Sequence, residues 1–263
     1  MLHSALLNVM IAAARKAARA LKRDFGELEK LQVSLKGPGN FVTAADRRAE
    51  ETLYAELMKA RPGYGFLGEE GGRREGADKS HTWIVDPLDG TTNFLHGIPQ
   101  FAISIGLERE GAVVAGLIYN PATEEMFIAE RGKGAFLNEQ RIRVAGRKRL
   151  GDAVIACGLP HHGHGDIPLS RKETGAMQDH VAGLRRFGAA ALDLAWVAAG
   201  RLDGYWERDV KPWDMAAGLI LVREAGGFVS DCDGGDEMFR KGNIAAGNES
   251  IQKQLLAVLK AAG

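Results

Sequence analysis

The segment 83–94 constrains the fold and chemistry of this chain more than any other. It reads Trp-Ile-Val-Asp-Pro-Leu-Asp-Gly-Thr-Thr-Asn-Phe. An apolar run, which predicts a buried strand, ends in Asp86, and a second acid, Asp89, follows three residues later. The Gly-Thr-Thr turn then leads into a predicted helix, whose first backbone N–H groups can bind an anion. Two close carboxylates repel each other unless a cation lies between them, and Mg²⁺ binds carboxylate and phosphate oxygens together. The segment therefore predicts a combined metal and phosphate site.

An Asp-Pro followed by Asp-Gly is by itself more typical of an ordinary turn. Two other segments favour the site over the turn, because each places an acid at the edge of an apolar stretch. Glu69 and Glu70 follow Phe-Leu-Gly, and Asp214 lies between Lys-Pro-Trp and Met-Ala-Ala-Gly.

Composition and charge narrow the class of protein. The 263 residues suffice for one large domain or two modest lobes. Acidic and basic residues balance at 34 each, which gives no support for binding to nucleic acid or to a membrane surface. The two cysteines, Cys157 and Cys232, fit a reducing cytosol better than a disulfide scaffold. The first ten residues lack signal-peptide features, and no apolar stretch is long enough to span a bilayer. We expect a soluble cytoplasmic enzyme.

The first half of the chain predicts helices followed by strands. An amphipathic pattern predicts a helix over 2–31, and residues 32–42 predict a loop. Thr43 to Asp46 form a capping-box pattern before a second helix that ends near Lys59. Alternating or apolar runs then predict two strands separated by a loop over 71–80, an antiparallel meander and a further strand pair. These strands span 65–68, 81–86, 101–109, 112–119, 125–130, 134–137 and 141–144.

The second half, from about residue 150, again mixes both kinds of element. Strands are predicted over 154–157, 202–207 and 227–230, and helices over 171–182, 189–199, 213–224 and 250–262. Strands followed by helices in both halves predict an α+β or mixed α/β fold with two sheets covered by helices.

Three motifs together resemble those of the inositol monophosphatase family. They are Gly-Glu-Glu at 68–70, the run 86–94, and Trp-Asp-Met-Ala-Ala-Gly at 213–218. The resemblance covers nearly the whole chain and is strongest to the bacterial extragenic-suppressor branch. It implies Mg²⁺-dependent, Li⁺-sensitive hydrolysis of phosphate monoesters, a homodimer, and a layered αβαβα sandwich with two largely antiparallel or mixed sheets. It also implies a single phosphatase domain over 1–263 with two lobes, about 1–149 for metal and phosphate and about 150–263 for the substrate alcohol.

The resemblance also assigns ligands to two Mg²⁺ ions. Glu69, Asp86 and the Leu88 carbonyl would hold the first ion, and Asp86, Asp89 and Asp214 the second. A third, weaker ion near Glu69 is part of the same expectation. Paired ions of this kind activate the attacking water and stabilise the leaving oxygen.

For the chemistry, the resemblance implies that water is the nucleophile. Thr91, oriented by Asp46, and Glu69 would position and deprotonate it, while Gly90 and Thr91 would bind phosphate through backbone N–H groups. From the residues alone, Asp46 is equally well explained as part of a helix start. Lys36 corresponds to a mobile loop near the metals in the family, and an exposed lysine is its alternative.

For the substrate alcohol, the resemblance points to Glu207, seven residues before Asp214, and to Ala190 within the segment 188–191. The family pattern there is Gly-Ser/Thr-Ala-Ala, and Ala189 departs from it by lacking the hydroxyl.

Other features have mainly structural explanations. The cluster His161-His162-Gly163-His164 resembles a soft-metal site but fits an exposed loop at the rim of the active site better. Trp213 is expected to pack and fix Asp214, and Arg185-Arg186 to be a solvated pair, with a phosphate or subunit contact as the alternative.

The favoured activity is hydrolysis of inositol 1-phosphate. Histidinol-phosphate phosphatase, 3′-phosphoadenosine nucleotidase and fructose-1,6-bisphosphatase share the expected fold and metals. A binding role in RNA-polymerase antitermination complexes is the alternative from a different class of function.

Overall fold

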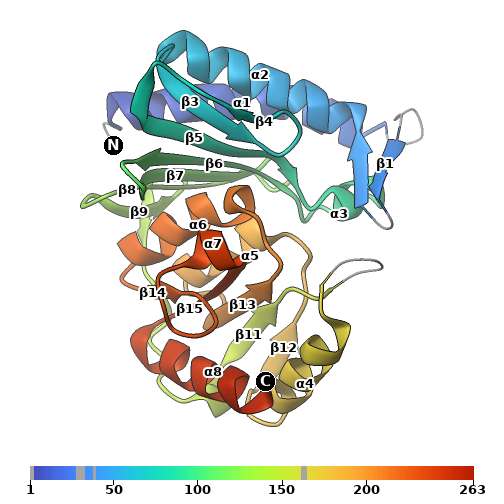
Figure 1. The fold of residues 1–263 in the computed structure, drawn as a ribbon, viewed down its shortest axis with the longest axis vertical. Helices are drawn as coiled ribbons and strands as arrows, with labels where there is room; N and C mark the ends of the chain where they lie inside the picture. The colour runs from blue at the N-terminus through green and yellow to red at the C-terminus, as the bar shows by residue number, and fades with distance from the viewer. Residues whose placement is uncertain (1–2, 28–32, 38–39, 161–164) are drawn as a thin grey trace.

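The structure, a computed structural model, describes residues 3–27, 33–37, 40–160 and 165–263, with only the backbone for 33–37 and 40–42. The described elements stack in five layers (Figure 1). Helices α1 and α2 cover an eight-stranded sheet, α5 and α6 form a central layer, and α4 and α8 cover a five-stranded sheet on its far side. The predicted αβαβα sandwich is confirmed. The helices are α1 (Ala5–Phe25), α2 (Ala44–Ala60), α3 (Thr91–Leu95), α4 (Ile167–Gln178), α5 (Ala190–Ala198), α6 (Pro212–Glu224), α7 (Met238–Lys241) and α8 (Glu249–Ala262).

The large sheet has the order β10-β9-β8-β7-β6-β5-β3-β4 and is antiparallel except where β3 pairs with β5. The predicted meander and the hairpin between 134–137 and the following strand are confirmed within it. Its strands are β3 (Tyr64–Gly68), β4 (Gly72–Arg74), β5 (Asp78–Asp89), β6 (Ala102–Arg109), β7 (Ala112–Asn120), β8 (Glu125–Glu130), β9 (Gly134–Leu137) and β10 (Gln140–Ile142).

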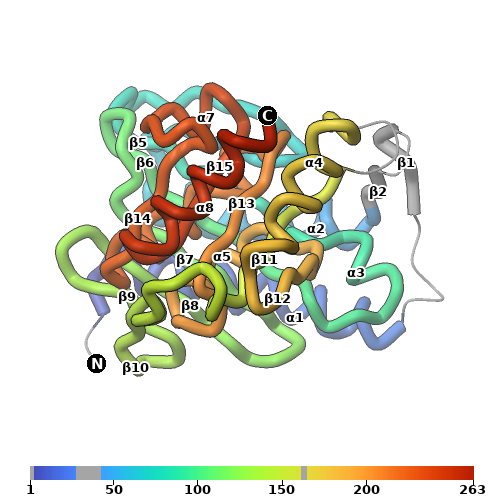
Figure 2. The backbone as a smooth tube through the Cα atoms, turned by 90° about the horizontal axis from the view of Figure 1, so that it is seen from below, coloured from blue at the N-terminus to red at the C-terminus, as the bar shows by residue number. Residues whose placement is uncertain are grey.

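The small sheet has the order β12-β11-β13-β15-β14 and is mixed. Strand β11 runs parallel to both of its neighbours, whereas the pairs of β15 are antiparallel. Viewed from below, α4 and α8 lie side by side over this sheet (Figure 2). Its strands are β11 (Val154–Cys157), β12 (Gly183–Arg185), β13 (Gly204–Arg208), β14 (Phe228–Ser230) and β15 (Asn243–Gly247), and the 3-10 turn Leu150–Asp152 precedes β11.

Several predicted boundaries were wrong. Helix α1 ends at Phe25, not near 31, and the segment predicted as a loop over 32–42 contains the hairpin β1 (Val33–Gly37) and β2 (Asn40–Thr43). Strand β4 lies inside the predicted loop 71–80. Helix α4 begins four residues before its predicted start at 171, because Asp166 caps it by accepting the Leu169 N–H at 2.9 Å.

Strands β12 and β15 and helix α7 were not predicted. They span only three to five residues each, too few for a periodic pattern to show. Strand β15 is stabilised by its two antiparallel neighbours, which no local pattern reveals.

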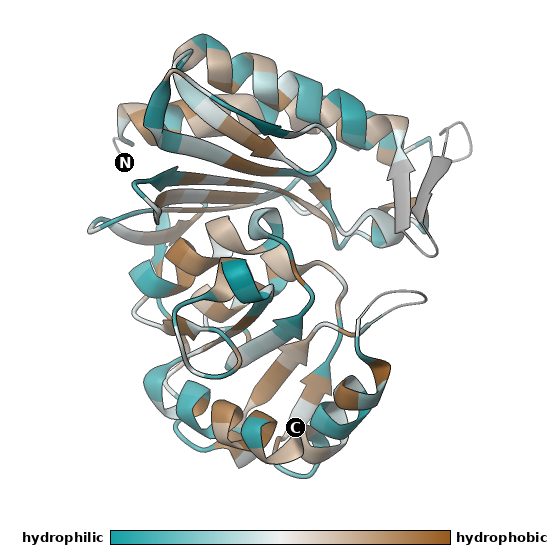
Figure 3. Ribbon diagram, in the orientation of Figure 1, coloured by the Kyte–Doolittle hydropathy of each residue, from teal (hydrophilic) through white to brown (hydrophobic). Residues whose placement is uncertain are grey.

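Three apolar cores fill the spaces between the five layers, and one of them extends over both sides of the central helices. Along β5, buried side chains alternate between two of them: Trp83 and Val85 face the layer of α1 and α2, and Ile84 faces the central helices. The third core lies between the small sheet and α4 and α8, and includes Trp206. Figure 3 shows the strands as largely hydrophobic and the outer helices as mixed in character. By the same alternation, Asp86 lies on the face of β5 that meets the central layer.

Two glycines let helix α6 sit directly on the large sheet. Gly106 and Gly116 are register partners on β6 and β7. A Cβ on Gly106 would lie 2.7 Å from the Ala216 Cβ, and one on Gly116 would lie 2.6 Å from Ile220 Cγ2 and 2.7 Å from the Ala217 carbonyl oxygen. Because α6 carries Asp214 in its first turn, this close approach also positions a predicted site residue.

We predict that Gly116→Ala lowers the free energy of unfolding by about 1–3 kcal/mol, because the added methyl group overpacks the contact with α6. Gly175→Ala is the matched control, because a Cβ at this helical position meets nothing within 4 Å. Denaturant unfolding of both variants measures the difference. Equal free energies of unfolding in the two variants would show that α6 can shift away from the large sheet without loss of stability.

Candidate functional site

Four predicted acids converge where the large sheet meets α6. Asp86 and Asp89 lie at the end of β5, Glu69 follows β3, and Asp214 is in the first turn of α6. The pairing of β5 with β6 shifts register between Asp86 and Asp89, and such a bulge re-aims the side chains beside it. Asp86 is 2% exposed and Asp89 is 8% exposed, whereas Glu69 and Asp214 are only partly buried. The cluster therefore has a buried floor and a more accessible rim.

Burial and mutual repulsion raise the pKa values of three of the acids in this cluster. Burial, followed by repulsion from Glu69, Asp89 and Asp214, raises the pKa of Asp86 well above its usual value. Burial and then the charge of Asp214 do the same to the pKa of Asp89. Burial raises the pKa of Asp214 to about 7, against the opposing effect of a backbone hydrogen bond. Keeping all of these acids ionised therefore requires positive charge nearby.

Backbone N–H groups fix one oxygen of each of three acids. Leu88 N donates to Asp86 Oδ1 at 2.8 Å, and Lys211 N donates to Asp214 Oδ2 at 2.7 Å. Ala191 N, in the first turn of α5, donates to Asp89 Oδ2 at 2.8 Å. The bond from Ala191 ties the end of β5 to the start of α5, whereas the other two are local and orient Asp86 and Asp214 within their own elements.

The acids fit a hard cation by donor type, although their present arrangement is open. Across the described ranges, no three His, Cys, Asp or Glu side chains stand close enough together to hold a metal ion. Four acids, with the backbone fixing one oxygen in three of them, match the oxygen ligands that Mg²⁺ takes.

The structure gives both predicted roles of Asp46 a physical basis, because its two oxygens differ in their partners. Oδ2 accepts the Thr43 N–H at 2.9 Å and the Thr43 hydroxyl, which completes the capping box of α2. Oδ1 accepts the Thr91 hydroxyl at 3.1 Å. The same hydroxyl lies 3.0 Å from the Leu88 carbonyl oxygen. Thr91 has one proton, so it donates to Asp46 or to Leu88 but not to both.

Gly90 begins α3 in a conformation that favours glycine. Its φ is 88°, and a Cβ there would lie 2.8 Å from the Gln100 carbonyl oxygen. The first N–H groups of a helix have no acceptor within the helix, so Gly90 and Thr91 present backbone donors beside the acids. Asn93, in the same helix, donates to the carbonyl oxygens of Gln100 and Phe187, each at 2.8 Å. It therefore links this turn to the segment before α5.

Glu50 was missed by the sequence analysis. It lies in α2, one helical turn after Asp46, and is 5% exposed. Its carboxylate accepts the N–H of Glu70 at 2.8 Å and that of Gly71 at 2.6 Å. Glu50 therefore holds the turn that carries Glu69. A second acid on the buried stripe of α2 was the signal available in the sequence.

The predicted substrate residues lie together beside the acids. Glu207, at the end of β13, is partly exposed, and Ala190, the first residue of α5, is 8% exposed. Burial raises the pKa of Glu207 to about 7, although the Tyr205 hydroxyl bonds to it. Ala189 precedes α5 with no side-chain cap, in agreement with its missing hydroxyl.

The remaining predicted residues are placed as follows. The Trp213 side chain packs against the central core, and its carbonyl oxygen accepts a hydrogen bond from the Ser104 hydroxyl at 3.1 Å. Arg185 and Arg186 are exposed. The side chain of Lys36 and the whole of 161–164 lie outside the described residues. Both cysteines are free and buried, and burial raises their pKa to about 12, so the thiols are neutral.

Comparison with known proteins gives a consistent result. A family profile described as the inositol monophosphatase family matches residues 3–263. The chain is 62% identical over 260 residues to an inositol-1-monophosphatase of Mesorhizobium japonicum, which covers 99% of this chain and 98% of that protein. It is 40% identical over 255 residues to the Nus factor SuhB of Escherichia coli K12, and the match covers 97% of this chain and 96% of that protein.

Among solved structures, the extragenic suppressor protein SuhB of Bartonella henselae superposes with a TM-score of 0.95 at 57% identity and covers 98% of this chain and 99% of that one. Within the described ranges, none of the helices combines the length and apolar character needed to cross a bilayer.

We predict that Mg²⁺ stabilises the protein through the acid cluster. At about one hundred times its dissociation constant, Mg²⁺ adds about 2.7 kcal/mol to the free energy of unfolding. Asp86→Asn is expected to melt higher than the wild type in EDTA, because it removes a buried like charge, and to lose most of the Mg²⁺ effect.

Thermal melting with EDTA and with Mg²⁺ measures both effects. The exposed Asp152→Asn is the control and should respond to Mg²⁺ as the wild type does. If Mg²⁺ raised the melting temperature of Asp86→Asn as much as that of the wild type, the proposed metal site at the acid cluster would be contradicted.

Proposed function

Because the chain belongs to the inositol monophosphatase family and is therefore a phosphoric monoester hydrolase, we propose that it converts inositol 1-phosphate to inositol and phosphate with Mg²⁺. The observation that carries this proposal is the Thr91 hydroxyl, set between the buried Asp46 and the Leu88 carbonyl beside the acid cluster. A hydroxyl that donates to a fixed carboxylate keeps its own oxygen available to accept a hydrogen bond from water. This arrangement supports a water nucleophile positioned by Thr91.

We propose that two or three Mg²⁺ ions bind Glu69, Asp86, the Leu88 carbonyl, Asp89 and Asp214, where they supply charge stabilisation and lower the pKa of water. Among the chain's own residues, Thr91 and Glu69 position and deprotonate the attacking water, and Asp46 orients Thr91. A proton taken up by the Thr91 oxygen is balanced by transfer of the hydroxyl's own proton to Asp46 Oδ1. The buried position of Asp46, which is 1% exposed, supports this role because its partners hold it in one place.

The phosphate and alcohol parts of the substrate are proposed to meet different elements. Backbone N–H groups of Gly90 and Thr91 bind phosphate oxygens at the start of α3. Glu207 accepts a hydroxyl of the alcohol, Asp214 borders it, and Ala190 lines the same side. The fixed link from Asp89 to Ala191 supports this division, because it holds α5 against the metal site.

We further propose a division into two lobes, about 1–149 and 150–263, together with Li⁺ sensitivity, a homodimer and a cytoplasmic location. The placement of the sheets supports the lobes: all strands of the large sheet lie within 64–142 and those of the small sheet within 154–247.

We expect Mg²⁺-dependent, Li⁺-blocked phosphate release that is fastest from inositol 1-phosphate. The comparison substrates are histidinol phosphate, fructose 1,6-bisphosphate and 3′-phosphoadenosine 5′-phosphate. Thr91→Val, which removes the hydroxyl, is expected to lower kcat about 10²–10⁴-fold on every substrate. Thr92→Val, at the exposed neighbouring position, is the control. A preference for another substrate would change the proposed substrate and leave the site unchanged.

The relatives named Nus factor SuhB favour a second candidate function, a binding role in RNA-polymerase antitermination complexes. The balanced charge of the chain gives no separate support for contact with RNA. A variant that loses catalysis and keeps its fold can separate the two functions.

If the binding role operates, a strain carrying Asp86→Asn should keep the wild-type transcription phenotype, because the substitution removes a metal ligand and leaves the surface unchanged. A deletion strain is the reference. Transcript read-through in the three strains measures the outcome. A phenotype in Asp86→Asn as strong as in the deletion would assign it to phosphatase activity.

A further inference from the structure

We propose that Tyr205 and Gly158 are positioning residues that hold the Glu207 carboxylate in place and so confer preference for polyol phosphates. This inference rests on the proposed function of the site. It concerns two residues that neither the motifs nor the acid cluster include.

Tyr205 supports Glu207 from beneath. Alternate residues of a strand share a face, so Tyr205 and Glu207 both point from β13 toward the central layer. Tyr205 is 0% exposed and belongs to the core that contains α5 and α6. Its hydroxyl donates to Glu207 Oε2, so one oxygen of the carboxylate is held by a fully buried side chain.

Gly158 leaves room for the Glu207 carboxylate on the side of Oε1, because glycine has no side chain there. It follows β11, and its N–H donates to the Trp206 carbonyl oxygen at 3.1 Å, which draws the chain against β13. A Cβ on Gly158 would lie 1.8 Å from Glu207 Cδ and 2.0 Å from Oε1. No side chain other than hydrogen fits there while Glu207 keeps its place.

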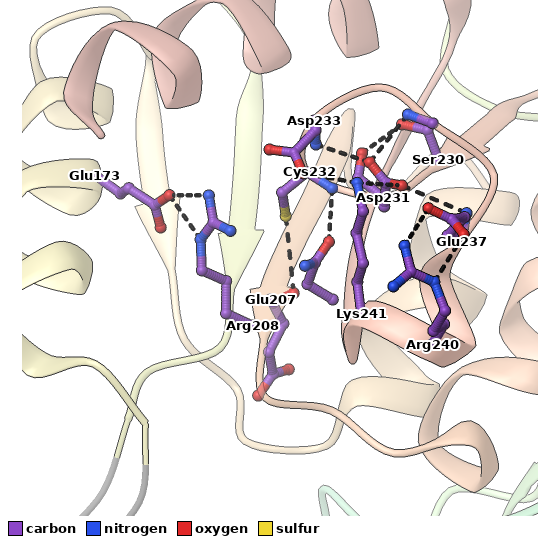
Figure 4. Close-up of polar contacts among 12 residues, drawn as sticks. Glu173, Glu207, Arg208, Ser230, Asp231, Cys232, Asp233, Glu237, Arg240 and Lys241 are labelled. Atoms are coloured by element: carbon purple, nitrogen blue, oxygen red, sulfur yellow. Dashed lines mark hydrogen bonds and ion pairs between the residues drawn. The ribbon is translucent and has the colours of Figure 1, made fainter.

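The main chain of β13 is anchored from the opposite face. Arg208 points away from Glu207 and forms an ion pair with the buried Glu173 of α4, at 2.8 Å from Nε and 2.6 Å from Nη2 (Figure 4). Cys232 Sγ lies 3.9 Å from the Glu207 carbonyl oxygen. The backbone at Glu207 is therefore fixed, and the position of its carboxylate depends on Tyr205 and Gly158.

These contacts divide the two oxygens of Glu207 between protein and substrate. Oε2 accepts the tyrosine hydroxyl, and Oε1 lies against Gly158, while the Glu207 residue as a whole is partly exposed. A carboxylate oxygen held in place is an acceptor for a substrate hydroxyl, and a site built for such a bond discriminates against substrates that lack it. A polyol phosphate offers that hydroxyl and an aryl phosphate does not.

The test compares inositol 1-phosphate with 4-nitrophenyl phosphate in four single variants and one double variant. Tyr205→Phe and Gly158→Ala are expected to lower kcat/KM for inositol 1-phosphate by about 10–100-fold, the loss typical of one hydrogen bond to a charged group. Turnover of 4-nitrophenyl phosphate should fall by less than about threefold. Glu207→Gln gives the loss of kcat/KM for inositol 1-phosphate when the carboxylate acceptor itself is replaced. Gly146→Ala is the matched glycine control, since a Cβ there meets nothing within 4 Å.

Adding Tyr205→Phe to Glu207→Gln is expected to cause little further loss, because both changes affect one interaction. Equal losses on both substrates, or full additivity in the double variant, would overturn the positioning role. Melting curves identify any variant that fails to fold. If Gly158→Ala fails to fold, the test rests on Tyr205→Phe, which only removes a hydroxyl. Wild-type enzyme without turnover of inositol 1-phosphate would instead overturn the proposed function.

Discussion

The mutual repulsion of buried carboxylates is the constraint on which the rest of this structure depends. Asp86, Asp89 and Asp214 come from two elements far apart in the chain, and burial and neighbouring charges raise the pKa of each. Such a cluster persists only because backbone N–H groups hold one oxygen of each acid and because the surrounding cores hold the elements that carry them. The fold therefore holds like charges together at a place where the proposed divalent cation would neutralise them.

Close backbone approach is the means by which the fold places these groups. The register pair of Gly106 and Gly116 lets α6 rest on the sheet, which sets the position of Asp214. The absence of a side chain at Gly158 leaves room for the carboxylate of Glu207. In each case a methyl group would displace a functional element, so the glycines contribute to the site without touching substrate.

The parts of the fold that the sequence predicted well are those with strong local signals. The run 83–94 indicated a strand, a turn and a helix start, and the alternating segments indicated the meander of the large sheet. Short strands such as β15 were missed because their stability comes from neighbours distant in the chain. Glu50 and Tyr205 were missed for the same reason: each is an ordinary helix or strand residue until its partner is known.

By itself, the sequence determined the family, the layered class of fold and the identity of the acids, because these follow from motifs a few residues long. Only the tertiary structure decided that one oxygen of Asp46 caps α2 while the other orients Thr91. It also decided that Glu50 supports the turn at Glu69 and that Tyr205 supports Glu207. The physical reason is range: a hydrogen bond depends on separations of about 3 Å in space, whereas a sequence pattern reports only separation along the chain.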